Sequence, residues 1–263
     1  MAITRIKAIL WLHTLRLRRY KWSFLNTILS ETAWIFLFIL GALLFVPSKY
    51  MDIAVKEAFW IIVAWNIISQ FSSLIGGWMN FFISIGMIEE HTVRGVSPFK
   101  MILGRIIPSF TVIVGSLLFM AAILNGVFKT NVLHINNPAL LVFSFLILFL
   151  EGLSYGLTIA AISIRTSVPY NMLEILNFAV IGLLMIPVQN LPGLMRIAYL
   201  CIPYVAPVHL AKIATGINVS ALFFEALAIS MVEALIMGLA ALYFIKSSER
   251  WMKRNGVRSV GFW

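Results

Sequence analysis

Charged residues are scarce in this sequence. Charged residues make up 11% of its 263 residues, apolar residues make up 61%, and the mean hydropathy is +0.97. A soluble domain of this size carries roughly a quarter of charged residues. Too few polar side chains are therefore present to cover a water-facing surface, which excludes an ordinary soluble protein. We expect the solvent around most of the chain to be lipid.

Cysteine and recognisable chemical motifs are also scarce. The single cysteine, Cys201, excludes an intrachain disulfide, and we expect it to be a small buried residue. The sequence has no phosphate-binding G-x-x-x-x-G-K-[ST] segment. The histidines lack metal-ligand spacing; they are His13, His91, His134 and His209. We therefore predict no metal site, no cofactor and no enzymatic activity for this chain.

Long apolar runs are what the chain has instead. A helix needs about 20 apolar residues to cross the hydrocarbon core, and a helix bonds its own backbone groups inside lipid. The runs are continuous rather than alternating, so they do not indicate a β-barrel. Six spans are predicted, at residues 24–46, 57–84, 106–126, 138–163, 172–189 and 218–245. The fold class is thus an all-α integral membrane protein, with residues 1–263 forming one transmembrane domain.

Lysine and arginine are distributed unevenly around these spans. Most lie in the N-terminal segment, in the tail, after span two or after span four: Arg5, Lys7, Arg16, Arg18, Arg19, Lys21, Arg94, Lys100, Arg105, Arg165, Lys246, Arg250, Lys253, Arg254 and Arg258. Fewer lie on the other side: Lys49, Lys56, Lys129, Arg196 and Lys212. The bias predicts a multi-pass cell-membrane protein with both termini in the cytoplasm. The net charge of +10 fits an anionic membrane surface better than a nucleic acid.

Residues 1–22 are predicted to form an interfacial helix. Ile3, Ile6, Leu10 and Leu17 recur at helical spacing, with basic residues mostly elsewhere. Such a helix lies along the lipid headgroups and turns sharply into span one. The alternative is a basic topology signal with no further role.

Among the glutamates in or near the predicted spans, the candidates for chemistry are Glu151, Glu174, Glu225 and Glu233. A charge in lipid is costly, so each should face protein or water or be protonated. One interpretation is a proton relay or a pathway lining. The other is a structural hydrogen bond or a position near the headgroups, and Glu174 could pair with Arg165.

Small residues in two spans predict close helix contacts. Gly152 and Gly156 match the small-xxx-small pattern of packed membrane helices. Gly76 and Gly77 in span two permit close packing or a kink.

A dense polar cluster interrupts the apolar sequence between spans two and three. Its residues are Glu89, Glu90, His91, Thr92, Val93, Arg94, Gly95, Val96, Ser97 and Pro98. We expect a short helix over residues 89–100, within a cytoplasmic segment at 86–104. Two acids and an arginine between membrane spans favour a contact point for another protein.

A second unusual tract precedes span six. Residues 191–207 are too apolar for an exposed loop and too short for two crossings, and prolines prevent one continuous helix. We expect two short re-entrant helices within an external segment at 190–216, packed against spans five and six. The candidate gate residues are Pro192, Tyr199, Pro203, Tyr204 and Pro207, with both tyrosines at a partly wet boundary. A packing plug that never moves is the alternative.

The order of these features resembles the permease subunits of ABC-2 type exporters. The likeness rests on Thr92 and Ser97-Pro98 in the polar cluster, and on Leu191-Pro192 through Pro203-Tyr204 in the second tract. His91 stands where the family usually has glycine, and Ile202 stands where it has asparagine.

The resemblance implies a mechanism and a set of partners. The chain would form half of a pathway, completed by a second copy or a related permease in the lipid bilayer. A separate cytoplasmic ATP-binding cassette subunit would bind ATP and Mg²⁺ and dock on the coupling residues Glu89, Glu90, His91, Thr92, Arg94, Ser97 and Pro98. The family's substrates vary, so the substrate does not follow. Two alternatives remain open: an ion-coupled secondary transporter or channel that uses the intramembrane glutamates, and a membrane-embedded enzyme or assembly factor.

Overall fold

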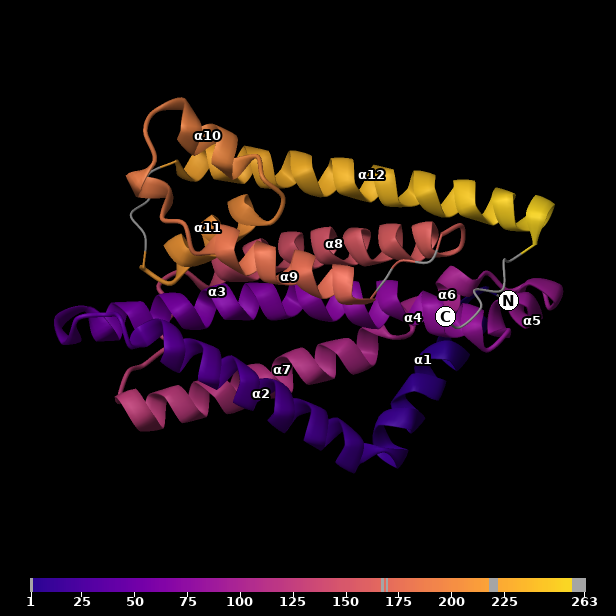
Figure 1. The fold of residues 1–263 in the computed structure, drawn as a ribbon, viewed down its shortest axis with the longest axis horizontal. Coiled ribbons are helices and arrows are strands. Elements are labelled where there is room, and N and C mark those ends of the chain that lie inside the picture. The colour runs from indigo at the N-terminus through magenta and orange to yellow at the C-terminus, as the bar shows by residue number, and fades with distance from the viewer. Residues whose placement is uncertain (1, 167, 169, 218–221, 257–263) are drawn as a thin grey trace.

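The computed structural model describes residues 2–166, 168, 170–217 and 222–256, which form helices joined by short connections and contain no strand (Figure 1). The all-helical prediction is confirmed for this part of the chain. The elements are α1 (Ala2–Arg19), α2 (Lys21–Leu43), the 3₁₀ turn η1 (Ser48–Tyr50), α3 (Met51–Phe71), the π-helical segment η2 (Ser72–Gly77), α4 (Trp78–Ser84), α5 (Met87–Val93), α6 (Pro98–Leu103), α7 (Ile106–Phe128), α8 (Pro138–Ser163), α9 (Tyr170–Leu184), the 3₁₀ turn η3 (Val188–Asn190), α10 (Leu194–Leu200), α11 (Val205–Ala214) and α12 (Phe223–Asn255).

Five segments of the described chain are long and apolar enough to cross a membrane. They are Lys21–Leu43, Ser48–Ser84, Pro98–Phe128, Pro138–Ser163 and Phe223–Asn255. They match the predicted spans one, two, three, four and six, although residues 218–221 of the predicted span six lie outside the described residues. The chain is thus compatible with a membrane protein.

The predicted span five is shorter than a full membrane crossing. Its helix α9 has only 15 residues and ends at Leu184 rather than at 189, whereas a crossing needs about 20. The bent pair α10 and α11 would count as a further span if it crosses the membrane as one unit. A total of six spans therefore stays a prediction.

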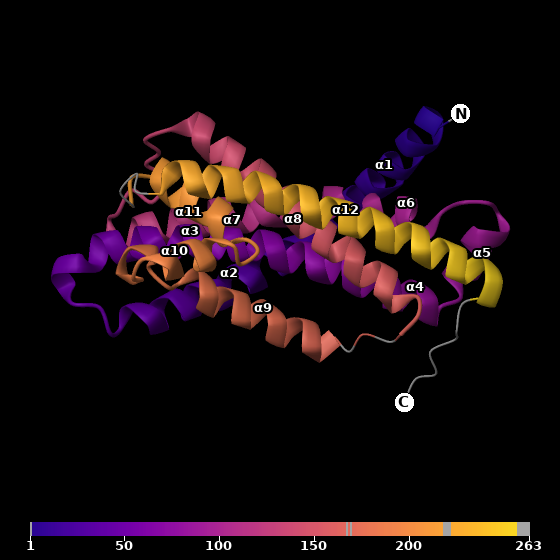
Figure 2. The same cartoon turned by 90° about the horizontal axis from the view of Figure 1, so that it is seen from above.

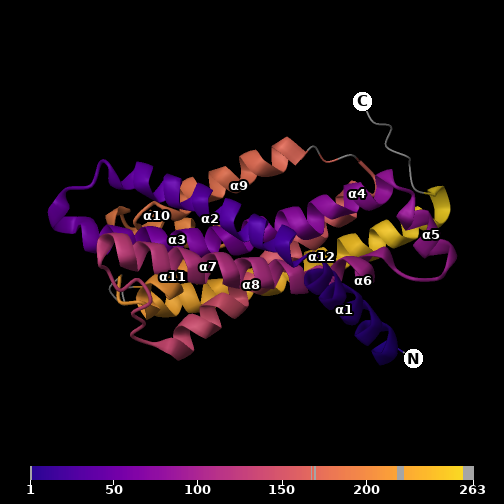
Figure 3. The same cartoon turned by 90° about the horizontal axis from the view of Figure 1, so that it is seen from below.

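The helices run along one long axis, and the two unusual segments lie near opposite ends of it. Helices α5 and α6 lie near the C-terminal end of α12, whereas α10 lies near the other end of the bundle (Figure 1). Helix α1 leaves the bundle sideways beside α6 in both perpendicular views (Figures 2 and 3). This arrangement suits one contact site at each membrane surface, and which surface is cytoplasmic stays a prediction.

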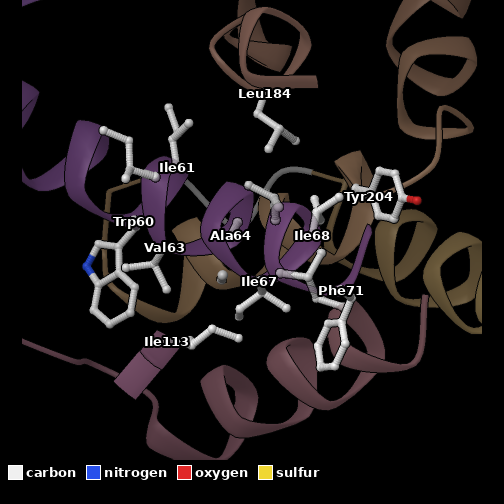
Figure 4. Close-up of a cluster of buried hydrophobic side chains, with 14 of the residues drawn as sticks. Trp60, Ile61, Val63, Ala64, Ile67, Ile68, Phe71, Ile113, Leu184 and Tyr204 are labelled. Carbon is white, nitrogen blue, oxygen red and sulfur yellow. The ribbon is translucent and has the colours of Figure 1, made fainter. Parts of the chain in front are cut away.

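Helix α3 is the centre of the hydrophobic core. From Phe59 to Phe71 its side chains are buried or half-buried on all sides, and it packs against α2, α7, α8, α9 and α11. Figure 4 shows Ile61, Ile67 and Phe71 of α3 pointing in different directions, with Ile113 of α7 and Leu184 of α9 on opposite sides. A helix that is apolar all round is expected in such a buried position.

Glycines set the distance between α8 and the α3–η2 span. A Cβ atom added to Gly156 would lie 2.4 Å from the backbone oxygen of Phe71, and one added to Gly76 would lie 2.7 Å from Cγ2 of Ile159. Gly152 faces the Phe71 ring in the same contact. The predicted close packing is therefore confirmed. The π-helical η2 lies at this contact, where one wide turn changes the direction of the following side chains.

Candidate functional site

The predicted coupling segment is an elbow of two short helices, α5 and α6, rather than one helix. Helix α5 ends because Gly95 has a φ of +67°, which a glycine adopts without steric cost. The Val96 N–H bonds back to the His91 carbonyl and the Gly95 N–H to the Thr92 carbonyl. This pair of bonds satisfies the last carbonyls of a helix. Pro98 then starts α6 at a position where no N–H is needed.

The outer surface of the elbow carries the charges. Glu89 and Glu90 are exposed, and Val93 is 88% exposed. The Arg94 guanidinium lies 2.5 Å from Glu90 Oε1 across one helical turn. Such an exposed pair contributes only about 0.3–0.5 kcal/mol to stability. Glu89, Glu90 and Arg94 are therefore free to contact a partner, because the fold depends on them little.

The inner surface of the elbow rests on the end of α12. Ser97 Oγ donates a hydrogen bond to Glu249 Oε1 at 2.6 Å, and Thr92 Oγ1 lies 3.6 Å from Met252 Sδ. Pro98 is buried, and His91 is half-buried with its Nε2 unpartnered. The seven predicted coupling residues thus divide. Three face outward, Thr92 and Ser97 contact α12, and the other two are half-buried or buried within the elbow.

Helix α1 docks beside this elbow through a buried polar junction. His13 is buried, and so is Arg105, whose guanidinium lies 3.4 Å from the centroid of the Trp78 ring. Burial, together with the charges of Arg105 and Arg16, lowers the pKa of His13 from 6.5 to about 4. The sequence predicted only that Arg105 is a basic residue of the loop after span two, because nothing in its local sequence indicates the contact with the Trp78 ring.

The apolar face predicted for α1 is only partly described. The side chains of Ile3, Ile6 and Leu10, like residue Arg258 of the tail, lie outside the described residues, and Leu17 is half-buried. Trp11 and Leu15 are exposed on this helix. An exposed tryptophan beside basic residues suits the headgroup region.

The predicted external gate is a bent helix pair. Helices α10 and α11 meet at an angle of 101°. Tyr204 begins α11 with a φ of +76°, an uncommon conformation for a residue with a side chain. Helix α11 contacts α9 and α12, the helices of the predicted spans five and six, as expected. It packs most extensively on α8 and also contacts α3, which was not predicted. The prolines divide: Pro192 and Pro203 are exposed, and Pro207 is buried.

Both candidate gate tyrosines are buried inside this chain rather than at a wet boundary. The Tyr199 hydroxyl donates to the backbone carbonyls of Leu183 and Ile186, which ties α10 to the end of α9. The Tyr204 ring packs edge-to-face on Tyr155 of α8, with centroids 6.1 Å apart. Cys201, which we expected to be buried, is exposed at the bend.

An ion pair fixes the other end of the bent pair. Lys212 of α11 is buried, and its Nζ lies 2.9 Å from Glu57 Oε1 of α3. The same ammonium donates to the Leu184 carbonyl at the end of α9. One lysine therefore joins three elements at this end of the bundle.

The intramembrane glutamates have different surroundings. Glu151 of α8 is fully buried; its Oε2 accepts from the Tyr204 N–H at 3.2 Å, and its Oε1 has no partner. Both carboxyl oxygens of Glu233 on α12 are buried without a partner. Glu225 is exposed in the first turn of α12, and Glu174 is exposed on α9. The suggested pair of Glu174 with Arg165 is not formed, because Arg165 Nη2 donates to Ser247 instead.

A cavity that the sequence did not reveal lies between α2, α3 and α9. Its volume is about 620 Å³, within the usual range of small-molecule sites. Its lining is mostly apolar and aromatic, with a few polar groups: Glu31, Trp34, Ile35, Leu37, Phe38, Ile62, Trp65, Asn66, Ser69, Gln70, Ser73, Leu173, Glu174, Asn177, Phe178 and Ile181.

Hydrogen bonds hold the polar wall of this cavity in place. Gln70 Nε2 donates to Glu31 Oε1 at 2.5 Å, joining α3 to α2. Trp65 Nε1 donates to the Asn177 carbonyl at 2.8 Å, joining α3 to α9. The only sequence signal for the site was an acid, Glu31, in the middle of an apolar span.

Comparison with known proteins adds no family to this picture, because the chain matches no protein-family model and no curated protein.

Proposed function

We propose that this chain is the membrane-spanning permease subunit of an ABC-2 type exporter, driven by a separate ATP-binding subunit. The observation that carries the proposal is the elbow of α5 and α6. It presents Glu89, Glu90 and Arg94 to solvent at one end of an apolar helix bundle. Charge-assisted contacts are stronger than neutral ones, so this surface suits a water-soluble partner. The chain itself carries no phosphate-binding loop.

The elbow is also placed to transmit a movement. Its inner surface contacts Glu249 and Met252 near the C-terminal end of α12. Helix α12 has 33 residues and packs most extensively on α8, and both helices contact α11 of the bent pair. A displacement of the elbow by ATP-driven closure of the partner would thus reach the other end of the bundle through one rigid helix. A second permease copy, or a related permease, would complete the pathway.

A charge-swap series on the elbow tests this proposal. The tagged chain is co-expressed with candidate ATP-binding cassette subunits, beginning with any that a neighbouring gene encodes, and co-purification and ATPase activity in liposomes are measured. Glu90→Lys places two cations one turn apart and should abolish assembly. The double variant Glu90→Arg with Arg94→Glu keeps the internal ion pair but inverts the surface, so it should also fail.

The matched control is a second ion pair of this spacing in the described chain, with an exposed acid and a half-buried lysine. Asp52 and Lys56 lie on α3 at the opposite end of the bundle, 3.9 Å apart. Asp52→Lys should leave assembly intact. If the double swap on the elbow assembled and stimulated ATPase activity normally, the charges would serve only the helix, and the proposed coupling role would be refuted.

A second candidate function has one specific observation in its favour. Glu151 and Glu233 carry buried carboxyl oxygens without partners, and an intramembrane acid often belongs to an ion or proton pathway. An ion-coupled transporter would move its substrate in liposomes that contain this chain alone, under an imposed ion gradient. Glu151→Gln should then abolish transport, whereas transport that needs ATP and the partner subunit would exclude this candidate.

A further inference from the structure

The cavity between α2, α3 and α9 contains an acid that has no cation. Glu31 lies in the middle of α2, and among the described residues it accepts a hydrogen bond from the neutral Gln70. No lysine, arginine or histidine of the described residues lies within ion-pair distance of it. An isolated acid at this depth is costly and marks a functional site whose partner has to be found. A ligand can supply the missing positive charge.

A second polar atom of the cavity also lacks a partner. Asn66 is 5% exposed and lies one turn before Gln70 on α3, so both side chains share a face. Its Nδ2 donates to Ser116 Oγ at 3.3 Å, but its Oδ1 is buried and accepts no hydrogen bond. An unsatisfied buried acceptor costs about 1–3 kcal/mol. The cavity wall therefore presents an acid without a cation, Glu31, and an acceptor without a donor, Asn66 Oδ1.

Aromatic rings supply the rest of the site. Trp34 of α2 and Phe178 of α9 line the cavity while remaining largely exposed, so they form its rim. Trp65 lies deeper, with its ring centroid 6.2 Å from that of Phe178 and its nitrogen held by Asn177. The faces of aromatic rings attract cations, tryptophan most strongly. Aromatic rings, a carboxyl group without a cation at Glu31, a second acid at Glu174 and an apolar lining together match one class of ligand.

We infer that this cavity binds a lipophilic organic cation. The positive centre pairs with Glu31, an N–H of the ligand, where present, donates to Asn66, and the apolar groups contact Trp34, Trp65 and Phe178. A lipid headgroup does not fit, because Glu31 lies halfway along a span and the headgroups lie at its ends. The inference deepens the proposed exporter function by naming its substrate class, and it rests on that function.

The test compares two probes of the same shape and opposite charge. Binding of tetraphenylphosphonium and tetraphenylborate to the purified full-length chain is measured by equilibrium dialysis in a nonionic detergent. The wild type should bind the cation at least about tenfold more tightly than the anion. Glu31→Gln should remove this preference, Glu31→Asp should restore part of it, and Trp34→Leu should weaken binding of the cation.

Two controls keep the result interpretable. Glu225→Gln removes an exposed acid outside the cavity and should bind the cation as the wild type does. If Glu31→Gln does not fold, Ser73→Cys in a Cys201→Ser background reports on the site instead. Tetraphenylphosphonium should protect that cysteine from maleimide, and tetraphenylborate should not.

The outcomes separate this inference from the proposed function. Equal binding of the two probes, or full cation binding by a folded Glu31→Gln variant, overturns the inference even if the ATPase subunit assembles normally. Failure of the wild-type chain to assemble with an ATP-binding subunit, together with intact cation selectivity, overturns the exporter proposal and leaves the cation site standing. Neither binding measurement needs the partner subunit.

Discussion

Lys212 on α11 and Glu57 on α3 form an ion pair with 2.9 Å between Nζ and Oε1, although 155 residues separate them in the sequence. The lysine side chain is 5% exposed, whereas that of the glutamate is 32% exposed. Removing the glutamate would leave a buried ammonium with only the Leu184 carbonyl as acceptor. The pair is thus the main polar link between the bent helices and the core.

The two ion pairs of α3 should therefore differ in their effect on stability. We expect Glu57→Gln to lower the free energy of unfolding by about 1–3 kcal/mol, because it leaves a buried charge unpaired. Asp52→Asn breaks the exposed pair with Lys56 and should cost less than about 1 kcal/mol. Thermal unfolding in detergent gives both values. In a double-mutant cycle with Lys212→Met, a coupling energy near zero would contradict the link.

Close packing between α8 and α3 predicts that one added methyl group at this contact lowers stability strongly. Gly156→Ala places a Cβ atom against the Phe71 carbonyl, so the helices must move apart, at a cost of roughly 1–3 kcal/mol. Gly182→Ala on α9 meets open space and should be neutral or slightly stabilising, since alanine is the better helix former. The two variants are compared by thermal unfolding and size-exclusion chromatography. Equal stability would show that the interface can adapt.

Protonation of His13 should loosen the docking of α1. Its pKa is about 4 in the folded chain and 6.5 when exposed, so the undocked state takes up the proton first as the pH falls. Stability should thus be full above pH 6.5 and decline between pH 6.5 and 4. The unfolding temperature is measured across this window.

Substituting His13 should flatten that profile. His13→Gln removes the titrating group from the junction with Arg105, whereas His134→Gln changes an exposed histidine between α7 and α8. We expect only the second variant to keep the acid-dependent loss of stability. An unchanged slope in His13→Gln would place the titrating group elsewhere.

Cysteine labelling tests the predicted orientation of the chain across the membrane. In a Cys201→Ser background, Arg94→Cys and Asn255→Cys should resist an impermeant maleimide in intact cells, because the distribution of basic residues predicts that both positions face the cytoplasm. The native Cys201 is exposed at the bend of α10 and α11 and should react in the same cells. Labelling of position 94 together with protection of Cys201 would reverse the topology.

Local sequence signals predicted the parts of the fold that depend on local physics. Continuous apolar runs marked α2, the α3–α4 span, α7, α8 and α12, since a helix in lipid needs little beyond length and hydropathy. Gly95 and Pro98 explain why the elbow consists of two helices. One helix was predicted here, although both residues signal a break. A glycine with positive φ and a helix-starting proline act within a few residues of themselves.

Features that depend on which helices become neighbours were not predictable. The cavity needs α2, α3 and α9 side by side. Its acid is recognisable as lacking a cation only when the basic residues of the described chain are seen to lie elsewhere. From the sequence, Arg105 is expected to be an ordinary charged residue of a loop. Its contact with the Trp78 ring is visible only in the fold. Tyr199 and Tyr204 suit a wet boundary by composition, yet both are buried by contacts with elements far away in the sequence.

The contrast between α3 and α12 has a consequence for how this sequence can change over time. In the most apolar window of each span, 76% of the α3 span is buried inside the chain but only 11% of α12. A replacement in α3 must fit the shapes of five neighbouring helices, so accepted changes there should come in compensating pairs. Outward positions of α12 such as Leu235, Leu239 and Leu242 meet only what surrounds the chain. Wherever that surrounding is lipid, each of these positions can change independently to another apolar residue. Between this chain and its relatives, sequence identity should therefore fall soonest in α12 and last longest in α3.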